Sequence, residues 1–218
     1  MSVGASPSSR TADRPLSDVA RYFASTLDAF GATPRGVDWN GDSAQQLRFD
    51  QLLRVVDVQG HFSINDLGCG YGALLEHLDS RDFDVDYLGI DLCAQMVDVA
   101  TERHRGRPHA AFVCGTSPPR EADYGVASGI FNMRLGRSRW QWTAYIEDTL
   151  DQLNATSRRG FSFNCLTSYS DPPKMRDDLY YADPCAVFDL CRRRYSKNVA
   201  LLHDYGLYDF TILVTKER

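Results

Sequence analysis

The stretch Ile64-Asn-Asp-Leu-Gly-Cys-Gly-Tyr-Gly-Ala-Leu-Leu75 decides the expected fold. A short apolar run ends near Asp66, glycines follow at three alternate positions, and apolar residues then resume at helical spacing. This order predicts a strand, a tight turn and a helix. Glycines permit positive φ and the close approach of a ligand, and the start of the following helix offers N–H groups to it.

A second acidic residue follows at a meaningful distance. The expected strand 87–90 ends at Asp91, which lies 91 − 72 = 19 residues after Gly72. A carboxylate there can accept hydrogen bonds from a ribose diol, both in dinucleotide-binding proteins and in other nucleoside-binding ones. The glycine spacing is G-x-G-x-G, whereas the dinucleotide pattern is G-x-G-x-x-G. With D-x-G-C-G-x-G at 66–72 and Gly-Ile-Asp-Leu-Cys-Ala-Gln-Met at 89–96, the chain resembles the class I S-adenosylmethionine (SAM) dependent methyltransferases from about Trp39 to its C-terminus.

The resemblance implies SAM as the cofactor and indicates which residues hold it. Asp66 would lie beneath the amino-acid end of SAM, Asp91 would accept from the ribose hydroxyls, and Leu92 and Met96 would flank the adenine. Many relatives carry Gly-Asp after the third strand, but this chain has Gly-Thr there, so the backbone or the threonine hydroxyl would meet the adenine. The expected cofactor-binding residues are Asp66, Gly68, Cys69, Gly70, Gly72, Asp91, Leu92, Met96, Gly115, Thr116, Ser128 and Ile130.

Composition limits the classes of protein. The 218 residues suit a single domain, and a net charge of −5 gives no basic surface for a nucleic-acid backbone. Six cysteines without a CxxC pair indicate reduced thiols, a cytoplasmic location and no metal site, and no apolar run is long enough to span a membrane. The expected partner is a small molecule, with no nucleic acid and no membrane, and the chain would be a monomer or a homodimer.

The N-terminal quarter is expected to be helical after a mobile tail at 1–14. Apolar residues at helical spacing predict a helix that ends at Gly31, and the Ser43-x-x-Gln46 pattern predicts a capping box at the start of a second helix. The second helix would be buried through positions 49, 52, 53 and 56. We therefore expect one methyltransferase domain over 15–218, with a helical cap at 15–60 and a Rossmann-like core at 61–218.

Strand and helix patterns alternate after residue 61, which predicts helices on both faces of a parallel sheet. Further strands are expected at 111–114, 124–131, 160–165, 199–203 and 208–214. The last two are joined by so few residues that they must pair antiparallel. The predicted fold class is α/β: a Rossmann-like, doubly wound, mostly parallel seven-stranded sheet with an antiparallel C-terminal hairpin and extra N-terminal helices.

The acceptor side of the site is less defined by sequence. Methyl transfer to a neutral amine needs no base, whereas an alcohol must lose its proton. His203 and Tyr181 are candidate catalytic residues, and packing roles for both stay open. Candidate substrate-binding residues are Trp39, Arg48, Arg134 and Tyr180; Arg134 would act within a basic triplet with Arg137 and Arg139, and a solvated loop or core packing are the alternatives.

The expected activity is transfer of a methyl group from SAM to an O or N atom of a small-molecule acceptor. The only Asp-Pro-Pro segment, at 171–173, lacks the aromatic residue of nucleobase-methylating relatives and reads as a turn. Two alternatives stay open at this point. The chain could be a catalytically silent SAM-binding or partner protein, or an NAD-dependent oxidoreductase.

Overall fold

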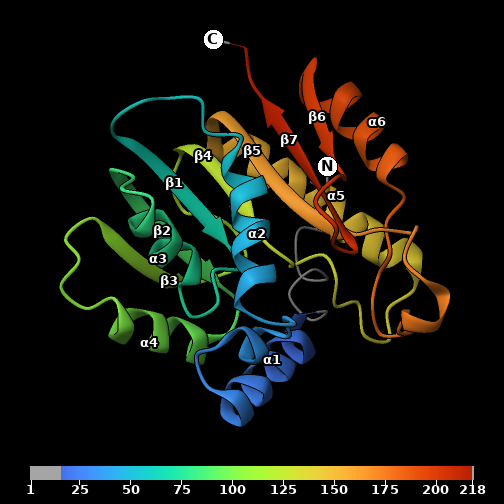
Figure 1. The fold of residues 1–218 in the computed structure, drawn as a ribbon, viewed down its shortest axis with the longest axis horizontal. Helices are drawn as coiled ribbons and strands as arrows, with labels where there is room; N and C mark the ends of the chain where they lie inside the picture. The colour runs from blue at the N-terminus through green and yellow to red at the C-terminus, as the bar shows by residue number, and fades with distance from the viewer. Residues whose placement is uncertain (1–15, 218) are drawn as a thin grey trace, which may run out of the picture.

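A computed structural model describes residues 16–217, and the mobile tail expected at 1–14 lies outside the described residues. Three helical segments come first, and strands and helices then alternate, except that no helix lies between the strands at 110–114 and 122–127 or between the last two strands (Figure 1). The helices are α1 (Ser17–Phe30), η2 (Pro34–Val37), α2 (Asp42–Leu53), α3 (Ala73–Ser80), α4 (Ala94–Arg103), α5 (Arg139–Thr156), η3 (Pro172–Lys174) and α6 (Pro184–Arg194). The strands are β1 (Phe62–Leu67), β2 (Val85–Asp91), β3 (Ala110–Cys114), β4 (Ala122–Ala127), β5 (Ser157–Leu166), β6 (Asn198–Leu202) and β7 (Asp209–Thr215).

The seven strands form one sheet in the order β3-β2-β1-β4-β5-β7-β6. The first five strands are parallel neighbours, and β7 runs antiparallel to both β5 and β6. The chain builds outward from β1 to β3 and then returns to place β4 on the other side of β1. This reversal of strand order lies between β1 and β4, where open α/β sheets bind their ligands. The predicted fold class is confirmed, including the antiparallel hairpin.

Two apolar layers hold helices against the sheet. One face of the sheet packs on α2 and α3 through residues such as Leu52, Leu74 and Leu78, all fully buried. The other face packs on α5 and α6 through residues such as Leu150 and Cys191. Figure 1 shows α2 in front of the sheet and α5 behind it. Both faces of the central strands are therefore covered, and five of the six residues of β1 and five of the six residues of β4 are buried.

Of the N-terminal helices, α1 packs near the carboxyl ends of the parallel strands, whereas α2 lies on one face of the sheet. α1 ends at Gly31 as expected, with φ of 67° and an N–H bond to the Leu27 carbonyl. The capping box predicted at Ser43 is wrong, because α2 already begins at Asp42, with Gly41 as its N-cap. A capping box does form at the start of α5, where Ser138 pairs with Gln141. Both segments have the S-x-x-Q pattern, so the pattern alone does not locate the helix start.

One strand boundary matters for the site. The sequence suggests a strand that continues to Phe131, but β4 ends at Ala127 and Gly129 takes a φ of 76°. The segment that follows is tied down from neighbouring elements: the Gly129 N–H donates to Asn164 Oδ1 of β5 at 2.7 Å, and Trp142 Nε1 donates to the Phe131 carbonyl at 2.7 Å. The backbone therefore leaves the sheet at 128 and forms a wall at its carboxyl edge.

No helix within residues 16–217 combines the length and apolar character needed to cross a bilayer.

Candidate functional site

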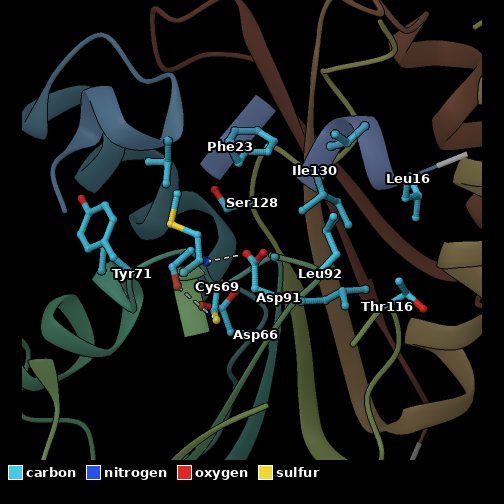
Figure 2. Close-up of a pocket in the computed structure, with 18 of the residues that line it drawn as sticks. Leu16, Phe23, Asp66, Cys69, Tyr71, Asp91, Leu92, Thr116, Ser128 and Ile130 are labelled. Atoms are coloured by element: carbon cyan, nitrogen blue, oxygen red, sulfur yellow. Dashed lines mark hydrogen bonds between the residues drawn. The ribbon is translucent and has the colours of Figure 1, made fainter. Parts of the chain in front are cut away.

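A cavity lies at the carboxyl ends of β1, β2 and β4, beside the reversal of strand order. It encloses about 970 Å³ between protein atoms, part of which is open to solvent. Figure 2 shows Asp66 and Asp91 close together at one side of it, with Phe23 of α1 on the other. Helix α1 thus covers a cavity whose base is made by strand ends and the glycine turn. We call this space the first cavity.

The glycine turn is fixed by the end of β2. The N–H groups of Gly68 and Cys69 both donate to the Ile90 carbonyl, at 2.7 and 3.1 Å. The Gly70 N–H donates to Asp91 Oδ2 at 2.9 Å. These donors are therefore engaged within the protein, so the turn keeps its shape without help from a ligand.

At two of the glycines, the space that a side chain would fill is occupied by other residues of the protein. A Cβ at Gly68 would lie 2.1 Å from Ile130 Cγ2, and one at Gly72 would lie 2.6 Å from His104 Nε2. Both residues also have positive φ, 81° and 83°. The sequence interpretation attributed these glycines to the close approach of a ligand. Gly72 does not line the first cavity, and its need for glycine comes from packing against His104.

Asp91 is held in a defined orientation. Its Oδ2 accepts from the Gly70 N–H, and its Oδ1 accepts from the Cys93 N–H at 2.8 Å. Burial raises the pKa of the Asp91 carboxyl above its ordinary value, while these backbone donors oppose the rise. A carboxylate can accept about four hydrogen bonds, so each oxygen keeps capacity for a further donor in the first cavity.

Asp66 lies deeper, where water is excluded. Tyr87 donates to Asp66 Oδ2 at 2.6 Å, and only 2% of Asp66 is exposed. Burial raises the pKa of the Asp66 carboxyl to about 7, against the opposing effect of the Tyr87 hydrogen bond. A cationic ligand group nearby would favour the ionised form of this carboxyl.

The residues of the first cavity fit SAM. The cavity offers a carboxylate for the ribose diol, at Asp91. It offers apolar contacts for the adenine, from Leu92 and Met96, and a polar group for the amino-acid end, at Asp66. The Ser128 hydroxyl also lines it and is a buried group with no hydrogen-bond partner among the described residues. Every residue expected to bind the cofactor lines this cavity except Gly72; their direct contact with SAM stays a prediction.

A second cavity adjoins the first, enclosing about 1400 Å³ that includes open solvent. The two cavities share four lining residues: Phe23, Val37, Trp39 and Gly129. The second cavity extends from there toward the start of β7 and the segment around η3. Its walls are largely apolar and aromatic, and among its charged groups Arg48 and Asp209 are buried.

The structure separates the candidates for acceptor binding into two groups. Trp39, Arg48 and Tyr181 line the second cavity, although Tyr181 uses its hydroxyl to accept the Arg176 N–H at 2.9 Å. Arg134, Tyr180 and His203 line neither cavity. The sequence suggested Trp39 and Arg48 because they lie in the N-terminal cap region, and the other four because they follow strands or border loops. Neither kind of position fixes the direction of a side chain.

The three residues outside the cavities have other contacts. The Arg134 guanidinium donates to the carbonyls of Arg137, Asp177 and Leu179, at 2.7 to 2.9 Å, so it braces a loop. Tyr180 is 8% exposed, and its hydroxyl lies 3.1 Å from that of Thr143. His203 is exposed, and its ring packs near Tyr169 and Phe210. Each of the three side chains therefore has contacts within the protein, and an acceptor role for any of them stays a prediction.

Sequence reasoning missed several lining residues. Val19 and Phe23 of α1 carried a visible apolar repeat, but the repeat does not say which part of the molecule the helix covers. Asp209 gave no signal at all, since a lone polar residue at the start of a strand has no pattern. Among residues 16–217 no group of three His, Cys, Asp or Glu side chains is arranged to hold a metal ion.

A mostly parallel sheet with a cavity at the reversal of strand order, lined by residues suited to a nucleoside, is typical of α/β cofactor-binding proteins. Comparison with known proteins shows which family within this class the chain belongs to. Residues 64–155 match a family model described as a methyltransferase domain. The chain is 68% identical over 164 residues to the protein named "Putative methyltransferase Rv1506c" of Mycobacterium tuberculosis, covering 75% of this chain and 99% of the relative.

Solved structures share the fold at low sequence identity. The magnesium protoporphyrin IX methyltransferase of Synechocystis, crystallised with bound SAM, superimposes with a TM-score of 0.64 at 13% identity, over 96% of this chain and all of that one. The small RNA methyltransferase HEN1 gives 0.57 at 15% identity, over 81% of this chain and 25% of that one. These acceptors differ widely, so the fold does not determine the acceptor.

The chain belongs to the SAM-dependent methyltransferases. SAM is its cofactor, and this assignment rules out the alternative of an NAD-dependent oxidoreductase.

Proposed function

We propose that this protein transfers a methyl group from SAM to an oxygen or nitrogen atom of a small molecule bound in the second cavity. The observation that carries the proposal is the junction of the two cavities at Trp39 and Gly129. An acceptor in the second cavity can meet a cofactor in the first cavity at this junction.

The cofactor supplies an activated methyl group on a sulfonium sulfur. The chain's own residues would bind and align the two partners and keep water out, which are the main requirements of such a transfer. In this proposal Asp91 and Asp66 hold the polar ends of the cofactor, while Trp39 and Phe23 form the apolar boundary of the junction. No base in the second cavity is required where the acceptor atom is a neutral amine.

The charge of the second cavity favours a small molecule over a nucleic acid. The exposed cations that line it are already paired: Lys174 lies 3.3 Å from Asp171, and Arg176 contacts both Asp38 and Asp178. Binding a phosphate backbone requires several free cations. The net charge of −5 adds to this argument.

The proposal is tested in two steps. Calorimetric titration with S-adenosylhomocysteine checks that the first cavity binds the cofactor product, and a screen with methyl-labelled SAM then searches a library of amines, phenols and alcohols for methylated products. Label in a product, lost in a Trp39→Ala variant that still binds S-adenosylhomocysteine, supports the proposal. Cofactor binding with label in none of the products would favour the silent SAM-binding alternative.

A further inference from the structure

The side-chain amide of Asn132 is held in one orientation in the wall of the second cavity. Asn132 lies in the segment after β4, and its main-chain carbonyl accepts the Tyr180 N–H at 2.8 Å. Its Oδ1 accepts the N–H of Leu166, the last residue of β5, at 3.0 Å. Because a backbone N–H can only donate, this bond fixes which end of the amide is the oxygen. The NH₂ group therefore points away from the Leu166 N–H.

This NH₂ group keeps accessible surface and has a hydrogen bond to give. None of residues 16–217 accepts a hydrogen bond from Asn132 Nδ2, and Nδ2 is not one of the polar atoms that are buried without a partner. The residue as a whole is only 8% exposed. It lines the second cavity and not the first. The small part of Asn132 that remains accessible therefore includes the donor, and a molecule in the second cavity can reach it.

A second donor lies on the same wall. Tyr181 directly follows Tyr180, whose N–H pairs with the Asn132 carbonyl, and Tyr181 also lines the second cavity. Its hydroxyl oxygen accepts the main-chain N–H of Arg176 at 2.9 Å, which leaves the hydroxyl proton for another acceptor. No side chain or carbonyl of the described residues takes that proton. This part of the wall therefore offers N–H and O–H groups to a bound molecule.

The rest of the second cavity favours a neutral partner for these donors. Apolar side chains such as Met133 and Leu207 line it. Among the described residues that line it, the cations Arg48, Lys174 and Arg176 each lie in an ion pair. An anionic group would therefore meet no free cation, whereas a carbonyl oxygen needs only a donor. An aromatic molecule with a carbonyl group matches both the apolar walls and the donors.

We propose that Asn132 selects the acceptor molecule: its Nδ2 donates a hydrogen bond to the carbonyl oxygen of an aromatic compound bound in the second cavity. This inference rests on the proposed function and names the class of its acceptor. The Asn132 N–H donates to the carbonyl of Gly129, a residue of the junction, at 3.3 Å. A molecule held by Asn132 therefore lies beside the junction. A molecule of the same shape without the oxygen would leave the amide donor unpaired, which weakens binding.

Asn132→Leu tests the role of this donor at similar side-chain size and shape. Leucine has neither a donor nor an acceptor, so the variant presents only methyl groups to the cavity. The substitution also leaves the Leu166 N–H without its acceptor, which lowers stability, and a measurement on wild type therefore accompanies it. Asn198→Leu is the matched control, because Asn198 is exposed on β6 and lines neither cavity.

The experiment measures binding to protein saturated with S-adenosylhomocysteine. The probes are the aromatic ketones indanone and tetralone, each paired with the hydrocarbon in which CH₂ replaces the carbonyl group, indane and tetralin. In NMR titrations the Trp39 indole signal reports occupation of the junction by either member of a pair. The side-chain amide signal of Asn132 reports the hydrogen bond, and in wild type the ketones should move its proton downfield relative to the hydrocarbons.

The measured quantity is the dissociation constant of the hydrocarbon divided by that of its ketone. The transfer of each probe out of water is the same for every variant, so a change in this ratio isolates the hydrogen bond. The ratio should be about fivefold to 150-fold smaller in Asn132→Leu than in wild type and Asn198→Leu. The affinity for S-adenosylhomocysteine should be the same in all three proteins.

The outcomes separate the two proposals. A wild type that does not bind S-adenosylhomocysteine contradicts the proposed function, and the role of Asn132 falls with it. If the cofactor product binds, three results overturn the role of Asn132 alone: no probe moves the Trp39 signal, ketones leave the Asn132 amide signal where the hydrocarbons do, or Asn132→Leu keeps the wild-type ratio. If Asn132→Leu does not fold, the two NMR signals of wild type decide the question.

Discussion

Replacing Asp91 with asparagine changes one oxygen of the first cavity to an NH₂ group and leaves the size of the side chain unchanged. In the protein, Asp91 uses its two oxygens to accept from the backbone N–H groups of Gly70 and Cys93. The single amide oxygen can serve only one of these donors at its present place. The NH₂ group must then face the other N–H, and it also removes an acceptor from the cavity.

The size of the expected loss in cofactor affinity follows from the hydrogen bonds that the carboxylate makes. A hydrogen bond to a charged group contributes about 1.5–3 kcal/mol, so losing one contact to the ribose diol should raise the dissociation constant of S-adenosylhomocysteine by about tenfold to 150-fold. A buried N–H left without an acceptor costs a further amount, about 1–3 kcal/mol, in the free energy of unfolding. The substitution should therefore weaken both cofactor binding and stability.

Titration with two ligands separates these effects. Calorimetry on wild type and Asp91→Asn would use S-adenosylhomocysteine and its 2′,3′-dideoxy analogue, which lacks the ribose hydroxyls. The wild type should prefer the hydroxylated ligand by about tenfold or more, and the variant should lose most of that preference. Asp86→Asn is the matched control, since Asp86 is also on β2 but pairs with Arg120 and lines neither cavity.

One result would refute the reasoning. If Asp91→Asn lowers the affinity for both ligands by the same factor, the carboxylate shapes the glycine turn without contacting the ribose. An unchanged affinity for S-adenosylhomocysteine would remove Asp91 from the site altogether.

Three further outcomes are expected. Arg48→Met should lower the free energy of unfolding, measured in urea, by about 3–5 kcal/mol, because it leaves the Asp209 carboxylate buried and unpaired; a loss below 1 kcal/mol would contradict this. The Asp66 carboxyl, with a pKa near 7 when folded and about 3.8 when unfolded, binds more protons in the folded state, so its contribution to stability falls as pH rises between these values. Between pH 5 and pH 8 the free energy of unfolding, measured in urea, should therefore fall by about 2–3 kcal/mol more in wild type than in Asp66→Asn. The figure comes from about two pKa units at about 1.36 kcal/mol each, and parallel pH profiles of the two proteins would contradict it. Gly68→Ala and Gly106→Ala both place alanine at positive φ, but only the first brings its Cβ within 4 Å of another atom, so its melting temperature should fall further; equal falls would show that backbone strain alone acts.

The sequence by itself determined the fold and the cofactor. The evidence for both is local: the D-x-G-C-G-x-G turn and the acidic residue 19 positions later. Such local patterns can be recognised in the sequence without knowing how the chain folds. The antiparallel hairpin also followed from sequence, because β6 and β7 are joined by too few residues for a crossover. Eleven of the twelve expected cofactor-binding residues line one cavity, because the carboxyl ends of parallel strands meet at one edge of the sheet.

Only the tertiary structure decided which residues line the second cavity. Arg48 and Asp209 are 161 residues apart and belong to α2 and β7, and nothing in either segment indicates the other. His203 and Arg134 looked equally suitable from the sequence, yet one is exposed outside both cavities and the other braces a loop. The physical reason is that a periodic pattern fixes an element and its buried face, whereas the direction of one polar side chain depends on which distant element packs beside it.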